Sequence, residues 1–310
     1  MSRIEEALRR SHAREIVPAG ESRGPAADSF KSPWDFSGTE VARIPERAPE
    51  RAPEQVSEQV TGPLSQLPEN ALETAGGVIS GFNSQWKQRL VVSDERDPYL
   101  VEQFRRLAAT LHQAQAANQI KTVMITSASP NDGKTLTAIN LALILSESYR
   151  RQVLLIDADL RRPSIRDVTQ MPDVVGLADG LRARAEQRLT VFRLTKNLSL
   201  LPAGRPDPDP MGSLTSSRMR RILADACSRF DWVVLDAPPV GTVSDASLLA
   251  EMVDASLLVV RAGQTDCGLT QKAIDAVGRE RILGVVLNGA QITATDRSYY
   301  QAYAPGASAE

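Results

Sequence analysis

Apolar positions along the C-terminal two-thirds of the chain switch repeatedly between two spacings. The first stretch of helical spacing, 98–114, places Leu100, Phe104, Leu107 and Leu111 on one face. Short apolar runs, typical of strands buried on both faces, then alternate with further helical stretches. The strand candidates are 123–126, 153–156, 198–201, 232–235, 257–260 and 285–287, and the helical ones are 135–146, 218–230, 246–252 and 269–279. This alternation predicts an α/β fold, a mainly parallel sheet with helices on both faces.

The residues before this region are predicted to be disordered, with a short helix at the start. Ser2 and Glu5 have the spacing of a capping box, so an amphipathic helix is expected over 1–15. This helix is either a frayed terminus or a docking element for a partner, because a short lone helix is marginal in water. Residues 16–95, with the tandem Glu-Arg-Ala-Pro at 46–53, hold few large apolar residues and are expected to form a disordered linker.

Charge and cysteine usage narrow the function classes. The formal net charge is −2 and the pI is about 5.9, so nucleic acid is not expected as a partner. Cys227 and Cys267 match no metal spacing, and His12 and His112 lie outside the best motifs, which argues against a His-based metal site or triad. The protein is expected to be soluble and cytoplasmic, since no apolar run approaches the roughly 18 to 20 residues of a membrane span and no secretory signal is present.

The strongest local motif is Ala-Ser-Pro-Asn-Asp-Gly-Lys-Thr at 128–135, between a predicted strand and a predicted helix. This is the context of a P-loop, in which backbone N–H groups and the helix N-terminus point at phosphate oxygens. Gly133 lets the backbone turn closely, Lys134 can reach the β and γ phosphates, and Thr135 offers a hydroxyl to Mg²⁺. Ala128 stands where the first glycine is usual. ATP is therefore expected to bind along Ser129, Pro130, Asn131, Asp132, Gly133, Lys134 and Thr135.

Two further predicted strands end in carboxylates. One apolar run ends in Asp157-Ala-Asp159, and another ends in Asp236. Ligands of open α/β sheets bind beyond the carboxyl ends of the strands, so these side chains and the P-loop are expected at one edge of the sheet. Mg²⁺ prefers oxygen ligands and keeps several waters, so a few carboxylates together with Thr135 suffice to hold it.

These motifs together resemble those of the bacterial tyrosine kinases (BY-kinases) of exopolysaccharide and capsule synthesis, whose P-loop fold is akin to that of partition and cell-division ATPases. The most specific part is Leu-Leu-Ile-Asp-Ala-Asp-Leu-Arg-Arg-Pro at 154–163, in which Arg161 and Arg162 face either phosphates or solvent. The stretches 235–239 and 284–288 and the residue Asp245 also look like family positions, and the resemblance runs from about 97 to 303.

The resemblance implies a role for each matching residue. Lys134 and Thr135 would bind the phosphates and magnesium, and Lys134 would also take part in catalysis. Asp157 and Asp159 would assist the metal and activate the attacking tyrosine hydroxyl. Asp236 would hold magnesium through water. Asn288 would lie near the base of the nucleotide.

A cluster of tyrosines lies near the C-terminus, where the resemblance implies autophosphorylation between subunits. Tyr299, Tyr300 and Tyr303 are three of the five tyrosines of the chain. Small residues around them suggest a mobile tail over 296–310 after a kinase domain over 96–295. The alternative is an aromatic patch on the last helix.

The resemblance also implies partners. Family members self-associate through a helix with the pattern Glu-x-x-Arg-x-x-Arg, which here reads Glu102, Arg105 and Ala108, so a ring or dimer is expected on an incomplete motif. A separate membrane protein that controls chain length would act as activator and hold the kinase at the periphery of the inner membrane. The opening Met-Ser-Arg-Ile-Glu-Glu-Ala-Leu resembles the start of kinases found beside exosortase-linked exopolysaccharide clusters.

Two other functions fit a P-loop chain of this kind. A partition-type ATPase carries an additional signature lysine early in the P-loop, whereas Ala128 and Ser129 stand there in this chain. A non-catalytic nucleotide-dependent regulator would signal by binding alone, yet Lys134, Asp157 and Asp236 are all present. The expected function is thus that of an ATP-dependent protein-tyrosine autokinase regulating exopolysaccharide synthesis or export.

Overall fold

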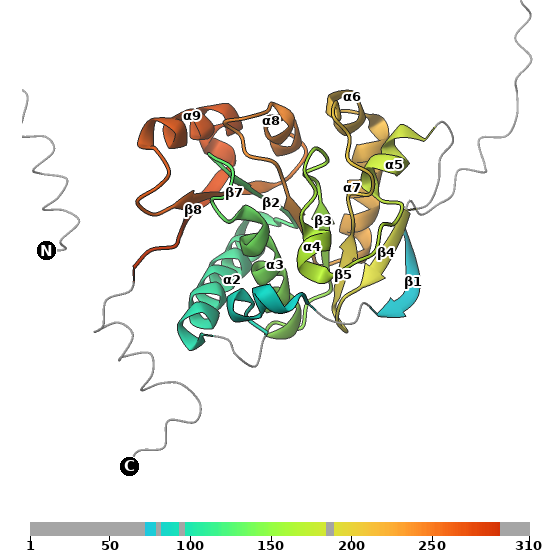
Figure 1. Cartoon of the computed structure of the whole chain (residues 1–310), viewed down its shortest axis with the longest axis horizontal. Coiled ribbons are helices and arrows are strands. Elements are labelled where there is room, and N and C mark those ends of the chain that lie inside the picture. Colours follow the sequence, from blue (N-terminus) through green and yellow to red (C-terminus); the bar gives the residue numbers. More distant parts are fainter. Residues whose placement is uncertain (1–71, 79–81, 93–96, 184–188, 292–310) are drawn as a thin grey trace, which may run out of the picture. The chain divides into compact units, whose positions relative to one another are not determined.

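Eight strands form one sheet in the order β1-β4-β5-β3-β6-β2-β7-β8, with β1 and β8 at its opposite ends (Figure 1). The computed structural model describes residues 72–78, 82–92, 97–183 and 189–291. All neighbouring strands run parallel except the antiparallel pair β4 and β5. The strands are β1 (Leu72–Val78), β2 (Thr122–Ser127), β3 (Val153–Asp157), β4 (Leu189–Arg193), β5 (Leu198–Leu201), β6 (Trp232–Asp236), β7 (Ala255–Arg261) and β8 (Ile282–Asn288).

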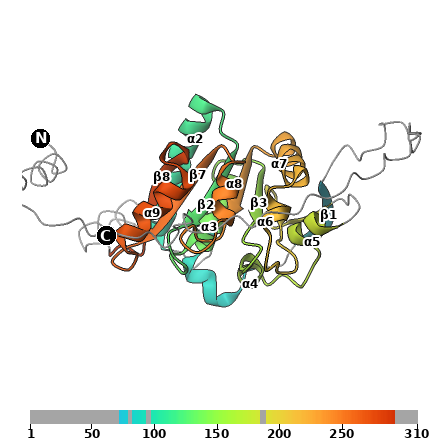
Figure 2. The ribbon, with the colours of Figure 1, turned by 90° about the horizontal axis from the view of Figure 1, so that it is seen from above.

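Helices cover both faces of this sheet, as predicted. Two short 3-10 helices accompany eight α-helices among the described residues. Figure 2 shows α9 beside β7 and β8 at one end of the sheet, and α5 near β1 at the other. The helices are α2 (Pro98–Asn118), α3 (Lys134–Glu147), α4 (Ile165–Thr169), α5 (Leu177–Arg182), α6 (Met211–Leu214), α7 (Ser217–Arg229), α8 (Asp245–Ala250) and α9 (Cys267–Val277), with η1 (Ser84–Arg89) and η2 (Arg279–Arg281).

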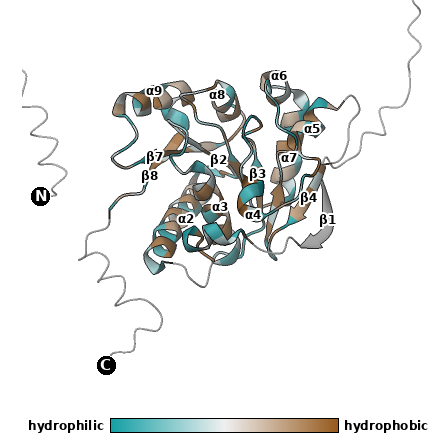
Figure 3. Ribbon diagram, in the orientation of Figure 1, coloured by the Kyte–Doolittle hydropathy of each residue, from teal (hydrophilic) through white to brown (hydrophobic). Residues whose placement is uncertain are grey.

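Alternate residues of each central strand enter two separate cores. Leu155 of β3 packs with α2 and α3 on one face, and Leu154 packs with α5, α7 and α8 on the other. Strands covered in this way read as continuous apolar runs, and in Figure 3 the central strands carry mainly hydrophobic colour. The side chains of α3 from Thr137 to Ser146 are buried, so this helix lacks a polar face. Because α3 starts at Lys134, it holds the end of the P-loop rigidly against the sheet.

The structure corrects the prediction of a disordered linker at two places, residues 72–78 and residues 82–92. Residues 16–95 were expected to be disordered, but β1 pairs with β4 and η1 is followed by the buried Leu90 and Val91. The Val91 N–H donates to Asn140 Oδ1 at 3.0 Å, and the Asn140 amide donates to the Arg89 carbonyl at 2.8 Å. These contacts with α3 order a segment that has too few apolar residues to be recognised alone. The predicted helix over 1–15, residues 16–71 and the tail over 296–310 lie outside the described residues.

In the part of the chain that the structure describes, no helix combines the length and apolar character required to cross a membrane.

Candidate active site at the carboxyl ends of β2, β3 and β6

The predicted P-loop connects β2 to α3 at the centre of the sheet. Asn131 and Gly133 both have a positive φ, of 66° and 98°, which is costly for most residues but free for glycine. A Cβ on Gly133 would lie 2.0 Å from the amide nitrogen of Asn288. Gly133 therefore allows both the turn of the loop and the close approach of β8.

Contacts from β7, β8 and the segment before α9 hold the loop in shape. The buried Asp132 carboxylate accepts hydrogen bonds from the Ser129 N–H at 2.9 Å and from the Thr265 hydroxyl at 2.7 Å. The Asn288 amide donates to the Asp132 carbonyl at 2.8 Å, and Arg261 donates to the Asn131 carbonyl at 3.2 Å. Contacts from three other segments of the protein thus fix the shape of the loop.

Lys134 lies among the three predicted carboxylates. Its Nζ is 2.8 Å from Asp159 Oδ2 and 3.7 Å from Asp236 Oδ1. Burial alone would lower the pKa of Lys134, but the charges of Asp236 and Asp159 raise it above its usual value. Lys134 is therefore a cation at neutral pH. Asp159 also accepts from the Arg162 N–H at 3.1 Å, which ties the 159–162 turn to the same carboxylate.

Asp157 and Asp236 face each other across the β3–β6 pairing, where they are register partners. Burial is the main reason why the pKa of each carboxyl lies above its ordinary range, and for Asp157 the charge of Asp236 raises the pKa further. Among the described residues, Asp157 Oδ1 has no hydrogen-bond partner, and Asp236 has the 3.7 Å ion pair with Lys134 but no hydrogen bond within 3.5 Å. Two buried carboxylates that share one lysine are suited to bind a further cation or a proton.

Thr135 faces these carboxylates from the first turn of α3. Its hydroxyl forms a 2.9 Å hydrogen bond with the hydroxyl of Ser164, a residue that the sequence analysis did not single out. No group of three His, Cys, Asp or Glu side chains in the described part of the chain could hold a metal by itself. A magnesium ion here would rest on Thr135 and two carboxylates, with water and phosphate oxygens as further ligands, which is the coordination that Mg²⁺ favours.

Arg161, for which the sequence allowed two interpretations, forms an ion pair with Asp245. Its guanidinium pairs with Asp245 through two hydrogen bonds of 2.6 Å and 3.1 Å and also donates to the Pro208 carbonyl. Asp245 is buried at the start of α8. The pair therefore ties the turn after β3 to α8. The side chain of Arg162 is exposed.

Other predicted residues lie apart from this site. Tyr299, Tyr300 and Tyr303 are outside the described residues. On α2, Glu102 is 3.9 Å from Arg105 and 3.7 Å from Arg106, so both arginines neighbour the same carboxylate on the helix surface. Ala108, which stands at the last arginine of the assembly motif, is fully buried.

Comparisons with known proteins show the family to which the chain is similar. A family model described as the CobQ/CobB/MinD/ParA nucleotide binding domain matches residues 123–305. The chain is 33% identical over 221 residues to tyrosine-protein kinase YwqD of Bacillus subtilis (strain 168), an alignment that covers 70% of this chain and 93% of YwqD. It is 30% identical over 229 residues to tyrosine-protein kinase wzc of Salmonella typhimurium, which covers 72% of this chain but 32% of wzc. The solved kinase domain of Escherichia coli tyrosine kinase ETK superposes with a TM-score of 0.57 at 30% identity, covering 63% of this chain and 78% of that domain.

Proposed function

Because the chain belongs to the bacterial tyrosine kinases of the CobQ/CobB/MinD/ParA nucleotide-binding family, we propose that it is an ATP-dependent tyrosine autokinase that regulates exopolysaccharide synthesis or export. The observation that carries this proposal is the position of Lys134. It extends from the P-loop into a buried group of three carboxylates, 2.8 Å from Asp159 and 3.7 Å from Asp236. The P-loop, which is expected to bind phosphate, and carboxylates that could accept a proton are therefore adjacent.

ATP would bind along 129–135. The loop N–H groups and the N-terminus of α3 would face the phosphates, and Lys134 would exchange Asp159 for the β and γ phosphates. The pKa of Lys134 is raised, so the lysine brings its positive charge to this exchange. Asn288, whose amide already contacts the loop, would lie on the side of the base.

Magnesium would be held by Thr135, Asp157 and Asp236, since their oxygens fit its ligand preference. When bound, the ion would neutralise charge that develops on the transferred phosphoryl group. The Oδ1 atom of Asp157 supports this assignment, because a buried carboxylate oxygen without a hydrogen-bond partner is costly, and the charge of Asp236 is balanced only by Lys134, which the phosphates would draw away.

Asp157 would accept the proton of the attacking tyrosine hydroxyl. Its Oδ1 supports this role, because this oxygen has no hydrogen-bond partner among the described residues and can accept a proton. Asp159 would assist by holding the 159–162 turn in place, and it would pair with Lys134 only until the phosphates bind. Phosphoryl transfer requires mainly positioning and charge neutralisation, so these groups suffice.

The acceptors would be Tyr299, Tyr300 and Tyr303 in the 296–310 tail of a second copy in a ring or dimer. Added phosphate charge would then weaken the assembly by repulsion. A separate membrane activator that controls chain length would place the kinase at the inner membrane. The predicted helix over 1–15 supports such a partner, because a lone short helix gains stability by docking.

Incubation with labelled ATP and Mg²⁺ tests the proposal. Wild type is compared with Lys134→Met, with Tyr299, Tyr300 and Tyr303 all changed to Phe, and with the control variants Lys272→Met, an exposed lysine on α9, and Tyr149→Phe. We expect phosphotyrosine in the wild type and both controls, and none in the other two variants. ATP hydrolysis without phosphotyrosine would instead favour a partition-type ATPase, and nucleotide binding without turnover would favour a non-catalytic regulator.

A further inference from the structure

Ser164 stands at the N-cap position of α4, yet its side chain does not cap that helix. A serine at this position ordinarily accepts a hydrogen bond from an N–H group of the first helical turn. Within the described part of the chain, the Ser164 side chain makes no such bond, and the Asp167 N–H donates instead to the Ser164 carbonyl at 3.2 Å. The Ser164 hydroxyl is therefore available for another contact.

That contact is with the helix that follows the P-loop. The Ser164 hydroxyl lies 2.9 Å from the Thr135 hydroxyl, although the two residues are 29 positions apart in the sequence. Both residues are half-buried. The hydrogen bond joins the first turn of α3 to the turn after β3, and these two segments carry the proposed magnesium ligands Thr135 and Asp157.

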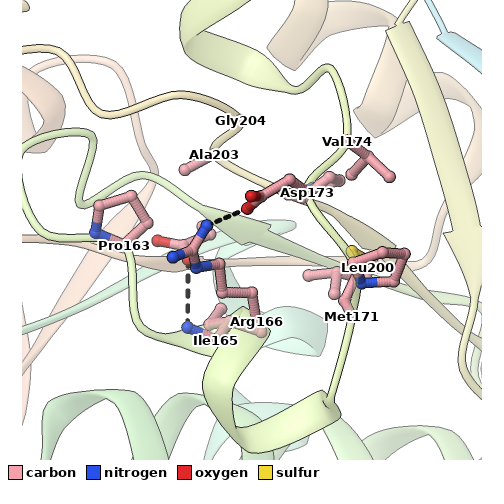
Figure 4. Close-up of a pocket in the computed structure, with 12 residues that line it drawn as sticks. Pro163, Ile165, Arg166, Met171, Asp173, Val174, Leu200, Ala203 and Gly204 are labelled. Atoms are coloured by element: carbon pink, nitrogen blue, oxygen red, sulfur yellow. Dashed lines mark hydrogen bonds and ion pairs between the residues drawn. The ribbon is translucent and has the colours of Figure 1, made fainter.

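Backbone hydrogen bonds on both sides of Ser164 fix its position. The Arg162 N–H donates to Asp159 Oδ1 at 3.1 Å. The N–H of Ile165, which begins α4, donates to Asp157 Oδ2 at 3.2 Å and is marked by a dashed line in Figure 4. Both acceptors are carboxylates of the site described above. The same side chains that are proposed to act on the metal and the substrate therefore hold the Ser164 hydroxyl next to the P-loop.

The direction of a hydroxyl proton decides whether its oxygen can bind a cation. A hydroxyl has one proton and two lone pairs, so it can bind a metal ion only when the proton is directed to an acceptor elsewhere. The Ser164 oxygen can accept the Thr135 proton at the observed 2.9 Å. Groups that orient a metal ligand in this way are typically worth about ten- to a hundredfold in metal affinity.

We propose that Ser164 is a positioning residue, which accepts the proton of the Thr135 hydroxyl and thereby directs the Thr135 oxygen toward magnesium. The inference rests on the magnesium site of the proposed function and adds a residue to it. Ser164 is not a ligand in this arrangement, because it acts through Thr135. Loss of its hydroxyl should therefore weaken the contribution of magnesium to nucleotide binding and leave the contacts between the P-loop and the phosphates in place.

The test measures ADP binding to the full chain by isothermal titration calorimetry, once with Mg²⁺ and once with EDTA. The ratio of the Kd in EDTA to the Kd in Mg²⁺ is called the magnesium gain. Ser164→Ala removes the hydroxyl, and Ser164→Thr keeps it. Ser216→Ala is the matched control, because Ser216 is an N-cap serine of α7 whose side chain does cap its helix, accepting from the Met219 N–H at 3.2 Å.

We expect Ser164→Ala to reduce the magnesium gain by about tenfold and to leave the Kd in EDTA within about twofold of the wild type. Ser164→Thr should retain the gain. Ser216→Ala should also retain it, but should lower the midpoint of urea unfolding more than Ser164→Ala does, since only Ser216 caps a helix. In a Thr135→Val chain, Ser164→Ala should cause no further loss of the gain, because the ligand that it positions is already absent.

Three results would overturn the role of Ser164 alone. These are an unchanged magnesium gain in Ser164→Ala, a Kd that rises equally in Mg²⁺ and in EDTA, and a further loss of the gain when Ser164→Ala is added to Thr135→Val. The last two would show a structural role that does not act through Thr135. A wild type whose ADP affinity gains nothing from Mg²⁺ would instead overturn the magnesium site of the proposed function, and this inference with it.

Discussion

The Thr265 hydroxyl donates a 2.7 Å hydrogen bond to the Asp132 carboxylate, so a residue that precedes α9 shapes the P-loop from outside it. The same hydroxyl accepts from the Arg261 N–H at 2.8 Å. Asp132 uses its other oxygen for the Ser129 N–H. A carboxylate inside a loop that binds polyphosphate would otherwise oppose binding, so we assign it the task of holding the loop.

Thr265→Val should weaken nucleotide binding without unfolding the chain. The change keeps the shape of the side chain but leaves an Asp132 oxygen without its donor, and we expect the Kd for ADP to rise about five- to tenfold, which corresponds to about 1 to 1.4 kcal/mol. Isothermal titration calorimetry measures the change. Thr265→Ser keeps the hydroxyl and should bind as the wild type does; equal Kd values for the Val and Ser variants would contradict the assignment.

Asp157→Asn should abolish tyrosine phosphorylation but stabilise the nucleotide-free chain. The pKa of Asp157 is raised, so between the unfolded and folded pKa values the folded chain binds more protons than the unfolded chain. The free energy of unfolding of the wild type therefore falls, relative to that of Asp157→Asn, as the pH rises above the ordinary pKa of an aspartic acid. Urea unfolding across this range without Mg²⁺ measures the difference. The exposed control Asp275→Asn should show no such trend, and a difference that shrinks with rising pH would refute the argument.

Arg161→Ala should destabilise the fold through Asp245. Asp245 has 1% of its side chain exposed and would lose its cation, whereas Arg161 is 29% exposed. We expect a loss of about 2 to 3 kcal/mol, less than for a fully buried pair. Arg161→Lys should recover only part of this, since lysine cannot reproduce the two-pronged contact.

Equilibrium urea unfolding measures these losses, with Arg162→Ala, at the exposed neighbouring position, as control. Because the two residues form a pair, the double variant Arg161→Ala/Asp245→Asn should lose less free energy of unfolding than the two single variants lose in sum. Full additivity would show that the two residues do not act as a pair.

Ala108→Arg should damage the chain rather than restore the assembly motif. Ala108 is fully buried on α2 in the core shared with α3, so a long charged side chain there would overpack the core and bury a charge. We expect a loss of about 3 kcal/mol or more in the free energy of unfolding. Ala116→Arg, at an exposed position of α2, is the control. Larger assemblies at unchanged stability in light scattering and unfolding would contradict this expectation.

Local patterns predicted the centre of the fold well. The runs at β2, β3 and β6 are continuously apolar because both faces of these strands are covered, and the P-loop motif marks its own position between strand and helix. The two strands at one end of the sheet, β1 and β4, were harder to predict. β1 reads LETAGGV, with two glycines and a charge, and β4 mixes buried and part-exposed residues, so neither stands out from its surroundings.

The contacts that complete the site could not be predicted from local sequence. Thr265 and Asn288 reach Asp132 across separations of 133 and 156 residues. They meet because β7 and β8 follow β2 in the sheet, and strand order does not appear in the spacing of a motif. The sequence could not decide whether Arg161 faces phosphate or solvent for the same reason, because its partner Asp245 lies 84 residues further along the chain.

Asn288 is the last residue of β8, and its amide holds the Asp132 carbonyl of the P-loop. The chain continues from there toward Tyr299. The residue that ends the last strand of the sheet therefore also fixes the backbone of the P-loop, so the edge of the sheet and the phosphate site at its centre are joined by one amide.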